Sequence, residues 1–172
     1  MNDNTPEFSR LVPLARLGAE PFLQRIEATP QERERLAQRF DLLALDSFAA
    51  EVELRRRSGE VVFLEAAFDA EYEQSCAVTL EPVRGAIAGR FSLVYGCIEN
   101  EESEIALSGE EPAFEPLTGD AIDIGEAVAQ ELSLALPEFP RHPDATIDDL
   151  EGSEPEEGPF ASLVHLRKHR EC

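Results

Sequence analysis

The strongest structural constraint in this sequence is an alternation of apolar and polar residues along its middle third. Within 62–72 every even position is apolar, whereas most odd positions carry a carboxylate. The same period of two occurs over 48–55 and 83–95. This period is typical of strands that bury one face and expose the other to water. The pattern predicts three long strands in an antiparallel meander, the second of them reaching Leu80, where Pro82 breaks it.

Capping residues mark two helix starts. Thr29 precedes a proline, and Glu32 follows three residues later, which is the spacing of a capping box with proline at the first helical position. This helix is expected to end near Phe40. Asp123 and Glu126 repeat the spacing, and apolar residues then recur every four positions, at Ile124, Val128, Leu132 and Leu136. That recurrence indicates an amphipathic helix, which the following proline ends.

Short apolar segments over 8–14 and 22–28 predict a further pair of strands ahead of the first helix. Together these elements predict an α+β fold. In it, an antiparallel meander or partial β-barrel packs against two amphipathic helices. Gly85 and Gly89 lie inside the third alternating run and would permit the bend that a barrel needs.

The composition of the chain changes after residue 140. Residues 141–159 are acidic and poor in apolar side chains, which is typical of a disordered linker. Residues 160–172 form a basic C-terminal segment that begins with a short apolar element. We therefore expect a single domain over 8–140, followed by a disordered acidic linker and a short C-terminal element.

The net charge limits the classes of partner that this chain can bind. Fifteen basic and 36 acidic residues give a formal charge of −21, which repels phosphate backbones. Such a surface could attract a basic partner or simply favour solubility. The three cysteines form no close pair, and no stretch approaches the roughly 20 apolar residues of a membrane span. We expect a cytoplasmic protein with no membrane contact and no disulfide framework.

No catalytic constellation is visible in the sequence. The three histidines lie in the linker or tail, so neither Cys76 nor Cys97 has a base for a nucleophilic pair. Thr79 stands where a Cys-x-x-Cys partner of Cys76 would complete half of a zinc site. Most carboxylates fall at outward strand positions, which favours a solvated face over an enzyme with buried paired carboxylates. We expect no catalytic residue, no cofactor and no metal.

Three motifs occur along the chain in a fixed order. Residues 76–83 read Cys-Ala-Val-Thr-Leu-Glu-Pro-Val, residues 131–137 read Glu-Leu-Ser-Leu-Ala-Leu-Pro, and residues 158–163 read Gly-Pro-Phe-Ala-Ser-Leu. Together they resemble the YceD family of large ribosomal RNA subunit accumulation proteins. Members of that family have a Cys-x-x-Cys-Leu-x-Pro strand end, a Leu-x-Leu-Ala-Leu-Pro helix and a terminal Asn-Pro-Phe-Ala-x-Leu motif.

The resemblance implies a non-catalytic ribosome biogenesis factor that supports the synthesis, processing or accumulation of 23S ribosomal RNA. Ribosome-assembly proteins or ribosomal proteins are the expected partners, and the basic residues of the tail could contact large-subunit ribosomal RNA or an acidic partner. Some relatives carry further cysteines after the helix, whereas residues 141–143 here contain none. The alternative, motivated by the charge alone, is an acidic interaction module or nucleic-acid mimic that binds a basic partner.

The candidate partner-binding residues fall into three groups. The first is the strand end around the motif cysteine, the second is the start of the second helix, and the third is the tail. Their members are Cys76, Leu80, Glu81 and Pro82, then Asp123 and Glu126, then Phe160, Leu163, Arg167 and Lys168. The structural interpretation of the same groups is a turn, a helix cap and a docking element.

Overall fold

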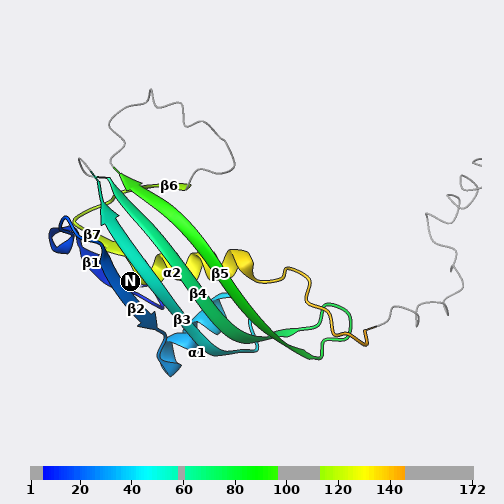
Figure 1. Cartoon of the computed structure of the whole chain (residues 1–172). Helices are drawn as coiled ribbons and strands as arrows, with labels where there is room; N and C mark the ends of the chain where they lie inside the picture. The colour runs from blue at the N-terminus through cyan, green and yellow to red at the C-terminus, as the bar shows by residue number, and fades with distance from the viewer. Residues whose placement is uncertain (1–5, 58–60, 97–112, 146–172) are drawn as a thin grey trace, which may run out of the picture.

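The computed structural model describes residues 6–57, 61–96 and 113–145 (Figure 1). Seven strands, two α-helices and one 3-10 turn over Leu14–Arg16 make up this part of the chain. In chain order the strands and helices are β1 (Leu11–Pro13), β2 (Phe22–Glu27), α1 (Pro30–Arg39), β3 (Ala44–Arg56), β4 (Val62–Ser75), β5 (Pro82–Gly96), β6 (Ala113–Pro116), β7 (Ala121–Asp123) and α2 (Ile124–Ala135).

The main sheet has the strand order β2-β3-β4-β5-β6, and all its pairs except β5–β6 are antiparallel. The predicted meander of three long strands is therefore confirmed, and so is the α+β class. The partial barrel is wrong, because β2 and β6 are the two edges of an open sheet and do not pair with each other. The apolar face is covered by helices, so the sheet does not need to close on itself.

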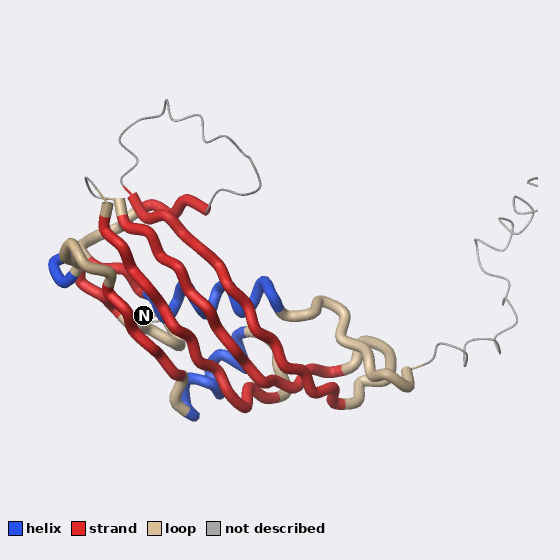
Figure 2. Tube along the Cα trace, in the orientation of Figure 1, coloured by secondary structure: helices blue, strands red, loops and turns tan. Residues whose placement is uncertain are grey.

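Both helices lie on the same face of the sheet (Figure 2), where α1 contacts β3 and α2 contacts β4 and β5. The even positions over 48–54 of β3 and 62–72 of β4 point to this face and are buried, as the alternation predicts. The rings of Phe8, Phe48 and Phe68 stack in series, with centroids 5.3 and 6.5 Å apart. Other fully buried side chains include Leu36, Leu54, Leu64, Ile124, Val128 and Leu132.

The two glycines of β5 have a packing role on this face. Tyr72 lies opposite Gly85, and Phe68 lies opposite Gly89. A Cβ atom at either glycine would lie 2.5–2.6 Å from the facing aromatic ring. Glycine at these positions therefore leaves room for large rings to lie across the strand.

Two local expectations differ from the structure. The segments 8–14 and 22–28 do not pair with each other. Instead β1 pairs with β7 and β2 pairs with β3, because Ile26 extends the buried face of the sheet opposite Ala50. Strand β4 ends at Ser75 rather than near Leu80, since a hydrogen-bonded turn begins at the next residue. The predicted linker beyond residue 145 and the C-terminal segment lie outside the described residues.

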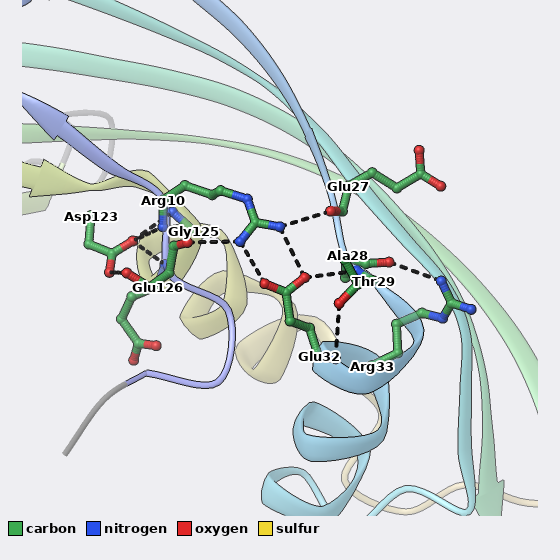
Figure 3. Close-up of polar contacts among 10 residues, drawn as sticks. Arg10, Glu27, Ala28, Thr29, Glu32, Arg33, Asp123, Gly125 and Glu126 are labelled. Carbon is green, nitrogen blue, oxygen red and sulfur yellow. Dashed lines mark hydrogen bonds and ion pairs between the residues drawn. The ribbon is translucent and has the colours of Figure 1, made fainter. Parts of the chain in front are cut away.

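The capping box at α1 is confirmed and is part of a larger polar network (Figure 3). The Thr29 amide donates to Glu32 Oε2 at 2.8 Å, and the Glu32 amide donates to Thr29 Oγ1 at 3.4 Å. The Arg10 guanidinium donates to both carboxylate oxygens of Glu32, at 2.6 and 3.0 Å. The backbone amide of Arg10 donates to Asp123, the N-cap of α2, at 2.7 Å. The segment before β1 thus joins the starts of both helices.

Replacing Glu32 with glutamine should remove a pH-dependent part of the stability. The bond from Arg10, with a smaller contribution from Thr29, lowers the pKa of Glu32 from 4.5 to about 2. A carboxyl group with a lowered pKa stabilises the folded state above its unfolded pKa, and this contribution is lost as the pH falls through the folded pKa. The thermal midpoint of the wild type should therefore exceed that of Glu32→Gln most at about pH 6 and least near pH 2. A difference that stays constant over this range would contradict the assignment.

Candidate functional site

Four of the predicted site residues lie together where β4 meets β5: Cys76, Leu80 and Glu81 in the turn and Pro82 at the first position of β5. We call residues 76–82 the hairpin tip. The tip lies beside the segment that follows α2 (Figure 1). The Ala77 amide donates to the Pro140 carbonyl at 2.8 Å, and the Gln74 side-chain amide donates to the Pro137 carbonyl at 3.3 Å. The structure therefore joins the first two sequence motifs at one end of the molecule.

Cys76 is the centre of this junction. Its thiol is buried, and Sγ accepts the backbone amides of Val78 and Thr79 at 3.4 Å and that of His142 at 3.3 Å. A side-chain hydrogen bond from Thr79, together with these amides, lowers the pKa of Cys76 to about 6. Hydrogen bonds to the charged form favour that form, so the amides hold a thiolate at neutral pH. The thiolate in turn holds the two segments together.

Titration of Cys76 tests this geometry directly. In a Cys97→Ser/Cys172→Ser background, the thiolate absorbance near 240 nm should rise with a midpoint near pH 6. Thr79→Val removes the largest single cause of the shift and should move the midpoint upward. The triple serine variant provides the baseline. A midpoint near the ordinary value of about 8.5 would show that the amides do not converge on the sulfur.

The tip also exposes apolar side chains. Leu80 adopts φ of 62°, in the left-handed region that a branched side chain rarely occupies, and is 77% exposed. Phe139, next to the residue that accepts the Ala77 amide, is 74% exposed, and Val78 is also exposed. We call Val78, Leu80 and Phe139 the tip patch. Exposed apolar side chains in a hydrogen-bonded turn are typical of an interaction surface.

The described residues of the tip offer a single thiol ligand. Three backbone amides donate to its sulfur, and threonine stands at position 79, where a second cysteine would complete a Cys-x-x-Cys pair. Across 6–57, 61–96 and 113–145, no group of three His, Cys, Asp or Glu side chains is placed to bind a metal. No helix in the same ranges is long and apolar enough to cross a bilayer.

Asp123 and Glu126 lie at the start of α2, which is about 18 Å long, whereas the tip contacts the segment beyond its other end. Asp123 accepts the amides of Gly125 and Glu126 at 3.1 and 3.2 Å, so the predicted helix cap is confirmed. Glu126 binds the Arg39 guanidinium at 2.8 and 2.9 Å, and Arg39 also donates to Glu7 at 2.9 Å. Asp123 therefore caps α2, and Glu126 links α2 to α1 through Arg39. Their role in partner binding stays a prediction.

The face of the sheet opposite the helices is hollowed over about 710 Å³, a feature that the sequence did not predict. Alternation identified its side chains as outward, but the small residues that open the hollow, such as Ala67, carry no signal of their own. Arg25 lies 3.6 Å from Glu51 on this face, and the lining also includes Glu53, Glu65 and Arg90. The outward positions of β4 carry a row of carboxylates, Glu65, Asp69, Glu71 and Glu73, and arginines of the neighbouring strands flank it. None of the charged side chains in the described segments is buried.

The segment after α2 is the part of the site that sequence reasoning missed. Residues 137–142 were expected only to end the helix and begin the linker, yet they supply three backbone groups to the hairpin. Pro137 and Pro140 were the sequence features that could have indicated an extended segment here. The remaining candidates, Phe160, Leu163, Arg167 and Lys168, lie outside the described residues.

Comparison with known proteins gives one informative match. The family described as large ribosomal RNA subunit accumulation protein YceD matches residues 64–166, which is more than half of the chain. The matched region begins near the start of β4 and includes the hairpin tip, α2 and the segment after it. No curated protein and no solved structure matches the chain.

Proposed function

This chain belongs to the YceD family, which is described by large ribosomal RNA subunit accumulation, and we propose from this premise that it is a non-catalytic ribosome biogenesis factor. In this proposal it supports the synthesis, processing or accumulation of 23S ribosomal RNA in the cytoplasm. The family match over 64–166 is the observation that carries the proposal. The chemistry of the site is consistent with binding, because the tip offers a rigid turn with exposed apolar side chains.

The proposed partner-binding surface is the hairpin tip together with the basic tail. The tip lies inside the family match, whereas β1, β2, α1 and β3 lie before it. Leu80, Glu81 and Pro82 would contact a ribosome-assembly protein or a ribosomal protein. Cys76 is buried and would not contact the partner; it would hold the turn in place through the hydrogen bonds to its sulfur.

The acidic body and the basic tail of the chain suit partners of opposite charge. The chain carries −21 overall, so its body repels phosphate and suits a basic protein partner. Arg167 and Lys168 are part of a short basic run and would contact phosphates of large-subunit ribosomal RNA. Such a contact should weaken steeply with salt, as phosphate contacts do.

Deleting the gene in its native organism tests the function. We expect the ratio of 23S to 16S ribosomal RNA to fall, together with the 50S peak on a sucrose gradient. Expression of the full chain from a plasmid should restore both. Ribosomal RNA ratios and gradients that do not change on deletion would overturn the proposal.

A further inference from the structure

We propose that residues 160–166 of the same chain dock on the tip patch. The inference goes beyond the proposed function, because it needs no ribosomal partner. Its starting point is that Leu80 and Phe139 are 77% and 74% exposed although they sit on a backbone fixed by hydrogen bonds from both segments. Exposed apolar side chains that lie together mark an interaction surface, and the hydrogen bonds from Ala77 to Pro140 and from His142 to Cys76 bring the segments of Leu80 and Phe139 together.

The C-terminal segment has the chemistry to cover this patch. Phe160, Leu163 and Val164 follow the i, i+3, i+4 spacing that places three apolar side chains on one face of a helical turn. Leu166 adds a fourth apolar residue. The family match extends across the acidic residues after α2 and ends at this leucine. The tip and this segment therefore both lie within the matched region.

The point at which the described chain ends places this segment within reach. The His142 amide donates to Cys76 Sγ at 3.3 Å, and the Ala145 amide donates to the His142 carbonyl at 3.0 Å. The described chain therefore ends beside the tip. Residues 146–159 then form a tether that spans about 50 Å at most when fully extended. A tether this short gives an effective concentration on the order of millimolar, so a weak apolar contact is enough for docking.

The hollow on the opposite face of the sheet is a poorer acceptor for this segment. Its lining includes Arg25, Glu51, Glu65 and Arg90, whose charges would be desolvated under an apolar helix face. Docking at the tip instead brings the basic residues that begin at Arg167 to the same end of the molecule.

Disulfide trapping tests this proposal in the purified full chain. In a Cys97→Ser/Cys172→Ser background, Glu81→Cys and Ser162→Cys place one thiol beside the patch and one inside the segment without removing an apolar contact. The control pair combines Ser162→Cys with Leu23→Cys, since Leu23 is 72% exposed and lies about 33 Å along the sheet from the tip. Peptide mapping under mild oxidation identifies which cysteines have joined.

We expect the tip pair to form its intramolecular disulfide on the order of tenfold faster than the control pair. Adding Leu80→Asn or Phe160→Asn to the tip pair should reduce its rate to that of the control. Equal rates for the two pairs would overturn the docking, and a rate that rises with protein concentration would show that a second copy is the occupant. Neither result bears on ribosomal RNA levels, so failure of the docking is distinguishable from failure of the proposed function.

Discussion

Replacing Phe48 with alanine is expected to lower the free energy of unfolding by about 3–5 kcal/mol. The side chain is 1% exposed, and its ring lies between those of Phe8 and Phe68, with centroid distances of 5.3 and 6.5 Å. Truncation leaves a cavity where the sheet meets the N-terminal segment, and neighbouring rings cannot fill it without leaving their rotamers. Urea unfolding followed by circular dichroism measures the loss.

Leu23→Ala is the matched control for this prediction. Leu23 is a large apolar residue of the same sheet, but it lies on the open face and is 72% exposed. Its truncation should change the free energy of unfolding by no more than about 0.5 kcal/mol. If Phe48→Ala costs no more than this control, the helices do not pack on the face that carries Phe48.

Gly125→Ala is expected to destabilise the fold by about 1–3 kcal/mol, although alanine favours helices. Gly125 lies in the first turn of α2, where propensity alone predicts a gain of about 1 kcal/mol. A Cβ atom there would, however, lie 2.9 Å from the Arg10 amide and in steric overlap with the Phe8 carbonyl oxygen. Both contacts are backbone atoms of the segment that crosses the helix start, so neither can rotate away.

Gly18→Ala separates this clash from the general effect of losing a glycine. Nothing lies within 4 Å of a Cβ atom at Gly18, so the substitution should be neutral or stabilise by a few tenths of a kcal/mol. The sign of the Gly125→Ala effect decides the issue. A stabilised variant would mean that the N-terminal segment does not cross the start of α2 at close range.

The buried faces of the strands and the starts of the helices could be predicted because each depends on a local sequence pattern. The alternation over 62–72 reports which side of a strand meets the core, and that relation holds wherever the strand is placed. The caps at Thr29 and Asp123 are also local, since each oxygen bonds an amide two or three residues away. These features fixed the helix starts and the buried face without knowledge of the topology.

The choice of strand partner depends on contacts that have no local signature. Val12 pairs with Ile122, and β6 joins β5 in parallel through the pairs that begin at Leu93 and Ala113. Neither pairing follows from the period of the segment, because β1 has only three residues and all four residues of β6 are exposed. The short strand β7 is too brief to show any period.

The hairpin tip illustrates the same limit in the candidate site. The residues of the tip could be named from the motif, but the contact between Ala77 and Pro140 joins two backbones 63 residues apart. Backbone hydrogen bonds of this kind do not constrain side-chain identity, so the sequence did not reveal the second half of the site. The hollow on the open face was missed because alanine is equally common on either face of a strand.

The central claim of this account is that the hairpin tip carries the ribosomal function. It is tested most directly by the ratio of 23S to 16S ribosomal RNA in a deletion strain that expresses variants at matched protein levels. Leu80→Asn/Phe139→Asn removes the two most exposed side chains of the tip patch, and asparagine tolerates the left-handed backbone at position 80. Leu23→Asn is the control on the other side of the molecule. We predict that the control restores the ratio and the tip variant leaves it at the level of the deletion strain, whereas full restoration by the tip variant would contradict the account.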